Sequence, residues 1–256
     1  MPRISRTILP RIQSSIARRG IATSMARAAL LPLHLFREYR TARRRKPGGP
    51  RSEFDIAHGV DTDGEFGGWT YLSDLEIASP NWIHGVDYCG IEPARFLAAI
   101  KSVNLKHEDF TFIDFGSGKG RALLIASEFP FRRVIGIEFS PELNAIAEQN
   151  IAHYRRGPSR CGAIETRCMD FVDFPLPAEP SLLYFYEPCD DQLFSTVVAN
   201  IRTSWREHPR PLHVIYIGPG NKGRLLDSCG FLVKKGHHAG FQFAWYEAVE
   251  CPRAAP

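Results

Sequence analysis

The stretch FIDFGSGKGRALLIA, residues 112–126, decides the fold. It begins as an apolar strand, passes through glycine at every second position (Gly116, Gly118 and Gly120), and continues as an apolar helix-like run. A strand, turn and helix of this kind open an α/β unit, and the turn presents bare backbone beyond the carboxyl end of the strand. Glycine permits positive φ and close approach of a ligand there. The turn alone is weak evidence, because many such turns use glycine for structural reasons.

From residue 110 onward, the spacing of apolar residues alternates between the periods of strands and helices. It predicts strands at 110–115, 133–139, 163–168, 181–186 and 212–217, and helices at 119–128, 140–157, 190–205 and 221–228. Two further strands, within 230–236 and 241–250, are expected to close the chain as an antiparallel pair. We therefore predict a doubly wound α/β fold with a mostly parallel sheet of seven strands.

Acidic residues stand at the ends of the first three predicted strands. Asp114 and Glu138 end the first two, and Asp170 follows the third beside Phe171. Carboxyl ends of parallel strands meet at one edge of a sheet, so the three acids should face one crevice. Glu138 is placed to accept both hydroxyls of a ribose, and Asp170 to accept the exocyclic amine of an adenine. Each acid alone could equally be a helix cap or a solvated charge.

The letters of the glycine turn exclude two phosphate-binding motifs. A dinucleotide fingerprint needs glycine where the chain has Arg121, and a P-loop needs serine or threonine where it has Gly120. What remains resembles the class I S-adenosylmethionine-dependent methyltransferases over roughly residues 85–250. The segments DFGSGKGRALLIA, VIGIEFSPEL and CMDF carry this resemblance.

The resemblance implies a Rossmann-like methyltransferase fold with strand order 3-2-1-4-5-7-6, the seventh strand being antiparallel, and S-adenosylmethionine as the cofactor. The chain looks most like uncharacterised bacterial members with GVDT and F-x-DFGSGKGRALL segments, here residues 59–62 and 112–124. Its glycine turn is similar to that of non-SET lysine methyltransferases. The expected cofactor-binding residues are Asp114, Gly116, Ser117, Gly118, Gly120, Glu138, Phe139, Asp170 and Phe171.

The end of the fourth strand, YFYEPCD at 184–190, bears on the chemistry. Relatives that methylate amines often have Asn or Asp there, then Pro and an aromatic residue, whereas this chain has Glu187, Pro188 and Cys189. A carboxylate at 187 could orient an ammonium and help to remove its proton, or it could be an ordinary strand-end acid. Both interpretations stay open at this point.

The segment WIHGVDYCGIEPARF, residues 82–96, is expected to fold over the cofactor as a lid. Within it, Tyr88 is a second candidate for contact with cofactor or acceptor, although a purely structural role is also possible. A sulfonium donor is already activated, so alignment of the reacting atoms supplies most of the acceleration. No metal site is expected. The predicted function is methyl transfer to an amine, such as a protein lysine or a small amino compound.

The first 50 residues hold twelve Arg or Lys and one acid, while the rest of the chain has 20 basic and 27 acidic residues. We predict a basic helical extension and linker at 1–52, a cap or lid segment at 53–109, and the cofactor domain at 110–256. The extension could be solvated, contact a membrane surface or be a transit peptide; otherwise a cytoplasmic location is expected. The acidic body makes nucleic acid an unlikely partner. The alternative function is a non-catalytic scaffold attached to a membrane or an acidic partner by its basic N-terminus.

Overall fold

The computed structural model describes residues 51–65, 68–154, 160–219 and 221–249. Apart from Glu65, these residues belong to one compact unit. The predicted basic extension falls almost entirely outside the described residues, as does the end of the helix predicted at 140–157. Within the described part, no helix is long and apolar enough to cross a membrane.

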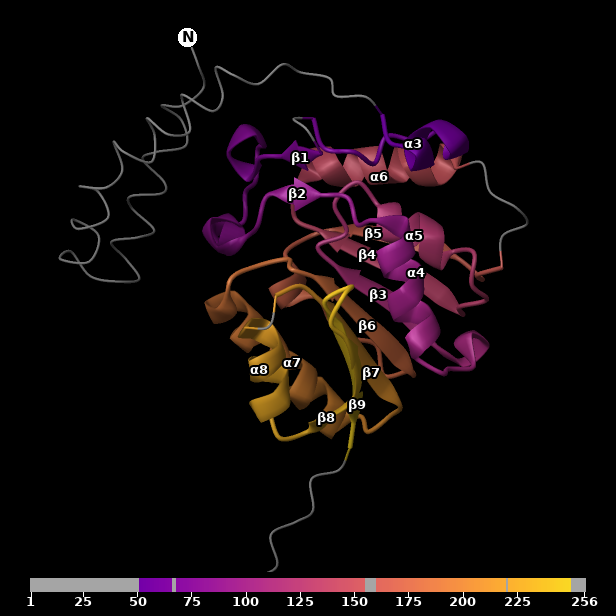
Figure 1. Cartoon of the computed structure of the whole chain (residues 1–256). Helices are drawn as coiled ribbons and strands as arrows, with labels where there is room; N and C mark the ends of the chain where they lie inside the picture. The colour runs from indigo at the N-terminus through magenta and orange to yellow at the C-terminus, as the bar shows by residue number, and fades with distance from the viewer. Residues whose placement is uncertain (1–50, 66–67, 155–159, 220, 250–256) are drawn as a thin grey trace, which may run out of the picture. The chain divides into compact units, whose positions relative to one another are not determined.

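A sheet of seven strands forms the centre of the unit (Figure 1). Its strands are β3 (Thr111–Phe115), β4 (Arg133–Glu138), β5 (Ile164–Cys168), β6 (Ser181–Tyr186), β7 (Leu212–Ile217), β8 (Leu232–His238) and β9 (Phe243–Ala248). They lie in the order β5-β4-β3-β6-β7-β9-β8, and β9 is antiparallel to both of its neighbours. This is the predicted strand order of the Rossmann-like methyltransferase fold. The prediction of fold class is confirmed.

Helices cover both faces of this sheet (Figure 1). On one side lie α4 (Pro93–Ser102), α5 (Arg121–Ala126) and α6 (Pro141–His153); on the other lie α7 (Asp191–Glu207) and α8 (Asn221–Ser228). Ser140, at the predicted start of a helix, caps α6: its hydroxyl accepts a hydrogen bond from the Leu143 N–H at 3.2 Å, and Pro141 follows it in the first turn. Apolar side chains from both faces of the sheet form two large buried clusters.

Short elements precede β3. They are α3 (Glu53–His58), β1 (Trp69–Thr70), β2 (Tyr88–Cys89), and the 3₁₀ turns η1 (Leu72–Asp74), η2 (Pro80–His84) and η3 (His107–Asp109). Strands β1 and β2 pair antiparallel as a sheet of their own. We call residues 69–91 the cap segment, because part of it lies over the carboxyl ends of the main strands.

Candidate functional site

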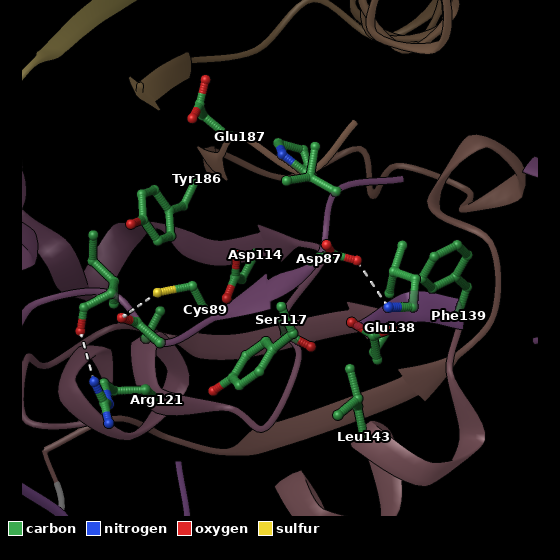
Figure 2. A pocket seen from close by; sticks show the side chains of 18 of the residues that line it. Asp87, Cys89, Asp114, Ser117, Arg121, Glu138, Phe139, Leu143, Tyr186 and Glu187 are labelled. Carbon is green, nitrogen blue, oxygen red and sulfur yellow. Dashed lines mark hydrogen bonds between the residues drawn. The ribbon is translucent and has the colours of Figure 1, made fainter. Parts of the chain in front are cut away.

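A crevice lies at the carboxyl ends of β3, β4 and β6, beneath the cap segment (Figure 2). Its empty volume is about 840 Å³, including the part that opens to solvent. The order of the strands reverses between β3 and β6, and the connections that leave these strands therefore part to opposite faces. The predicted residues that line it are Tyr88, Asp114, Gly116, Ser117, Glu138, Phe139, Phe171 and Glu187.

Asp114, at the end of β3, is a buried carboxylate without a hydrogen-bond partner among the described residues. Only 3 % of its surface is exposed. Burial, with a smaller effect from the negative charge of Glu138, raises the pKa of Asp114 well above its usual range. Burying a charge without a partner is costly, so this position favours a ligand that brings a cation or hydrogen-bond donors.

Glu138, at the end of β4, is also 3 % exposed, but backbone groups hold it in place. One carboxylate oxygen accepts the Gly118 N–H at 2.8 Å and the other accepts the Ser140 N–H at 2.8 Å. Burial raises the pKa of Glu138 to about 7, because these backbone bonds offset only part of the desolvation. The same carboxylate therefore holds the glycine turn through Gly118, holds the residue that precedes α6 through Ser140, and lines the crevice.

The raised pKa of Glu138 predicts that ligand binding depends on pH. Below about 7 this carboxyl is protonated, and above it the anion is the stronger acceptor for ligand hydroxyls. For the ligand-free protein the sign is opposite: the folded state holds this proton more tightly, so its stability falls as pH rises from 4.5 toward about 7. We expect the affinity for S-adenosylmethionine to rise about tenfold between about pH 5.5 and about pH 8.5 by titration calorimetry. A flat profile in the wild-type protein, or an equal rise in Glu138→Gln, would contradict this.

The three glycines of the turn are explained by the protein's own packing. All three have positive φ: +88° at Gly116, +53° at Gly118 and +85° at Gly120. A Cβ at Gly116 would lie 3.0 Å from Pro188, and one at Gly120 would lie 3.2 Å from Ala147 of α6. A Cβ at Gly118 would overlap the ring of Tyr88. Gly118 and Gly120, expected to bind the cofactor, do not line the crevice.

Asp170 also has a different environment from the one expected. Its carboxylate accepts hydrogen bonds from the Ser79 hydroxyl, from the Asn81 side chain at 2.8 Å and from the Val172 N–H at 3.0 Å. It caps a short 3₁₀ turn, η4 (Phe171–Asp173), and is not part of the lining, although Phe171 is. The acid at the end of the third strand therefore anchors the cap segment.

A second anchor joins the cap segment to the end of β6. The Asp190 carboxylate contacts His84 Nδ1 at 2.6 Å, and the Asp190 N–H donates to the His84 carbonyl at 2.7 Å. Gly85 and Cys189 form an isolated antiparallel bridge beside this pair. The two anchors place residues 86–91, which lie in the predicted lid, along the crevice.

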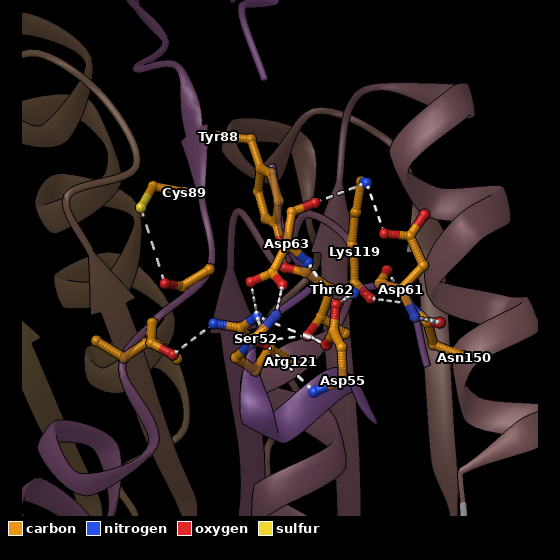
Figure 3. A network of polar contacts seen from close by, with 12 residues as sticks. Ser52, Asp55, Asp61, Thr62, Asp63, Tyr88, Cys89, Lys119, Arg121 and Asn150 are labelled. Atoms are coloured by element: carbon orange, nitrogen blue, oxygen red, sulfur yellow. Dashed lines mark hydrogen bonds and ion pairs between the residues drawn. The ribbon is translucent and has the colours of Figure 1, made fainter. Parts of the chain in front are cut away.

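Tyr88 is held in place by the segment that precedes the cap segment (Figure 3). Its hydroxyl donates to the Thr62 carbonyl at 2.6 Å, while its ring covers Gly118. Thr62 is buried, and both its N–H and its hydroxyl donate to the Asp55 carboxylate. The structure therefore supports Tyr88 as a wall of the crevice that the N-terminal segment fixes in position.

Lys119 and Arg121, in and directly after the glycine turn, form hydrogen bonds with residues 61–63 (Figure 3). Lys119, which is 2 % exposed, donates to the Asp61 carboxylate at 3.1 Å and to the Asp63 carbonyl at 2.8 Å. Arg121 donates to the Thr62 hydroxyl at 2.6 Å and to the Asp63 carboxylate. The segment 52–63 is thus fastened to the back of the turn, which explains the GVDT residues that sequence analysis could only match to relatives.

Glu187 occupies the rim of the crevice. It has φ of +42°, which is strained for a residue with a side chain, and its carboxylate accepts the Tyr216 hydroxyl at 3.4 Å. Figure 2 shows this carboxylate directed away from Asp114. Several other lining residues were not predicted from the sequence, among them Asp87, Cys89, Arg121, Leu143, Tyr184 and Tyr186. Those from the cap segment carried no local signal, because only long-range contacts bring them here.

No protein-family model and no curated protein matches the chain. Among solved structures, it is similar to a predicted N6-adenine-specific DNA methylase from Listeria monocytogenes, at 14 % identity over 62 % of this chain and 51 % of that chain, with TM-score 0.46. It is also similar to an RNA methyltransferase from Salinibacter ruber in complex with S-adenosyl-L-homocysteine, at 16 % identity over 66 % of this chain and 97 % of that chain, with TM-score 0.44. A third similar structure is a ribosomal protein L11 methylase from Lactobacillus delbrueckii subsp. bulgaricus, at 14 % identity over 61 % of this chain and 76 % of that chain, with TM-score 0.47. The chain spans about half the length of the Listeria protein.

These comparisons correct one prediction. Two of the three similar structures are described as methylases of DNA or RNA, so the prediction that nucleic acid is an unlikely partner is wrong. It depended on the net charge of the whole body, and net charge does not report which groups surround one crevice. At these identities the fold itself rests on the observed strand order.

Proposed function

We propose that the protein is an S-adenosylmethionine-dependent methyltransferase that acts on an amino group. The observation that carries this proposal is the pair of buried acids at the ends of adjacent strands, Asp114 and Glu138, in one crevice. S-adenosylmethionine carries a sulfonium and an ammonium cation as well as a ribose diol. The described crevice lining has four acids (Asp87, Asp114, Glu138 and Glu187) and one Lys or Arg, Arg121, which is already paired with residues 62 and 63.

The lining residues divide into groups that match the parts of this cofactor. The free lone pairs of Glu138 would accept from the ribose hydroxyls, and the apolar side chains of Phe139, Leu143 and Phe171 would contact the adenine. Asp114 would hold the ammonium group of the zwitterionic amino-acid tail. When bound, the cofactor supplies an activated methyl group, so the chain's own residues need only align the acceptor and exclude water.

Titration calorimetry with S-adenosylmethionine tests cofactor binding directly, and absence of heat from the intact protein would contradict the proposal. The acceptor requires a second experiment. A cell extract would be incubated with the protein and labelled S-adenosylmethionine, then separated into protein, nucleic acid and small-molecule fractions. Label on an amino group in any fraction supports methyl transfer to amines. Cofactor binding without any labelled acceptor would favour the non-catalytic scaffold.

Glu187 is our candidate for contact with the acceptor amine. If its carboxylate orients the amine and takes up its proton, Glu187→Gln should lower the methylation rate about 100-fold while the dissociation constant of the cofactor stays within about twofold. Glu92→Gln is a suitable control, because Glu92 caps the exposed start of α4 and does not line the crevice. An unchanged rate in Glu187→Gln would make Glu187 an ordinary strand-end acid.

A further inference from the structure

Tyr184, in the middle of β6, differs from the other buried tyrosines. Of the four tyrosines that are buried among the described residues, Tyr154, Tyr216 and Tyr246 each donate a hydrogen bond, to Glu128, Glu187 and the Gly223 carbonyl respectively. Tyr184 is 1 % exposed, and its hydroxyl has no hydrogen-bond partner in the described part of the chain. Buried hydroxyls are nearly always satisfied, so an exception that lines a crevice points to a ligand.

The sheet register places Tyr184 beside Asp114. The two residues are direct partners in the parallel pair of β3 and β6, so their side chains lie on the same face of the sheet. The Ser117 hydroxyl, from a residue that is 5 % exposed, is also buried without a partner and belongs to the same crevice. A carboxylate and two hydroxyls therefore belong to the lining of one crevice, and no described protein group forms a hydrogen bond with any of them.

The chemistry of these three groups selects a primary ammonium. An ammonium has three N–H donors and no acceptor, and the site offers one anion and two neutral oxygens. Burial, followed by the charge of Asp114, raises the pKa of Tyr184 well above its usual range, so the phenol keeps its proton. Its oxygen can then accept one N–H of the ligand while the Asp114 carboxylate accepts another.

We propose that Tyr184 is a cofactor-binding residue, whose hydroxyl acts with the Asp114 carboxylate to hold the ammonium of the cofactor's amino-acid tail. This inference rests on the proposed function. Figure 2 shows Asp114 between Tyr186 and Glu138, so the tail would extend from the ribose beside Glu138 toward Tyr186. Tyr184 is thus a binding residue within a strand that is otherwise apolar and buried over most of its length.

The test compares two ligands by titration calorimetry with the full chain. S-adenosylhomocysteine keeps the ammonium and has a neutral sulfur, whereas 5′-methylthioadenosine keeps the nucleoside and lacks the tail. We expect Tyr184→Phe to weaken S-adenosylhomocysteine about tenfold, the loss typical of one hydrogen bond to a charged group, and to leave 5′-methylthioadenosine within about twofold. Equal weakening of both ligands, or of neither, would overturn the inference.

Tyr246→Phe provides a matched control on the same chemical change. Its hydroxyl is buried but donates to the Gly223 carbonyl at 3.3 Å, outside the crevice. We expect Tyr246→Phe to lower the melting temperature by about 2–4 °C and leave both affinities unchanged. Tyr184→Phe should instead melt no lower than wild type, because it removes an unsatisfied group. A larger loss in Tyr184→Phe than in Tyr246→Phe would show a structural partner and overturn the inference. If wild-type protein binds neither ligand, the proposed function itself has failed.

Discussion

Replacing Glu138 by alanine is expected to weaken the binding of S-adenosylmethionine by about 100- to 1,000-fold, since two hydrogen bonds to a charged group are lost together. The loss has a second cause in the protein. Without the carboxylate, the N–H groups of Gly118 and Ser140 lose their acceptor, so the glycine turn and the start of α6 are less well fixed before any ligand arrives. Titration calorimetry at pH 8 measures the change, because the anion dominates above about 7.

Two variants separate these causes. Glu138→Gln keeps a side chain of the same size and an oxygen acceptor, so it should recover part of the affinity and most of the stability. Glu179→Ala removes a glutamate that is tied to Thr111 and Arg133, where β3 and β4 begin, at the opposite end of these strands. It should lower stability and leave cofactor binding unchanged. Wild-type affinity in Glu138→Ala would remove Glu138 from the cofactor site.

Replacing Gly118 by alanine is expected to lower the free energy of unfolding by about 3–5 kcal/mol. About 1–2 kcal/mol of this comes from a side chain at positive φ, and the rest from overlap with the ring of Tyr88. That ring has little room to move away, because its hydroxyl is bonded to Thr62 on the far side. Denaturant unfolding gives the stability, and calorimetry should show that displacement of Tyr88 weakens the cofactor as well.

The control for this substitution is Gly230→Ala. Gly230 has φ of +78° and no atom within 4 Å of its added Cβ, so it tests the backbone cost without the overlap. We expect a loss of about 1–2 kcal/mol there. Tyr88→Ala introduced into Gly118→Ala should restore part of the lost stability. Equal losses in the two glycine variants would show that Tyr88 does not press on the turn.

The main strands could be predicted because each is formed by one continuous, mostly apolar run of residues. The predicted limits of β6, β7 and α8 agree with the structure, and α6 begins directly after Ser140, where a helix was predicted to begin. Asp114 and Glu138 could be placed for the same reason: strand ends in a parallel sheet meet at one edge whatever the loops do. The antiparallel position of β9 followed from the resemblance to a family and is confirmed.

The contacts of the cap segment could not be predicted, because they join residues far apart in the chain. The sequence predicts Asp170 as one more acid that faces a ligand, yet the side chains of Ser79 and Asn81 donate hydrogen bonds to its carboxylate. Local periodicity contains no information about which distant polar groups will satisfy a carboxylate. The sequence does not single out Tyr184 for a related reason: it lies inside a predicted strand, and its position beside Asp114 follows only from the register of β3 and β6.

The pairing of Lys119 and Arg121 with residues 61–63 sets a practical limit on trimming the protein. A recombinant version that begins after Gly64, in order to discard the basic N-terminus, would lack the carboxylates of Asp61 and Asp63. The Lys119 ammonium and the Arg121 guanidinium would then be buried without these partners. Such a version would be poorly soluble for reasons unrelated to catalysis. The useful start site lies ahead of Ser52, whose side chain caps α3 and contacts Arg121.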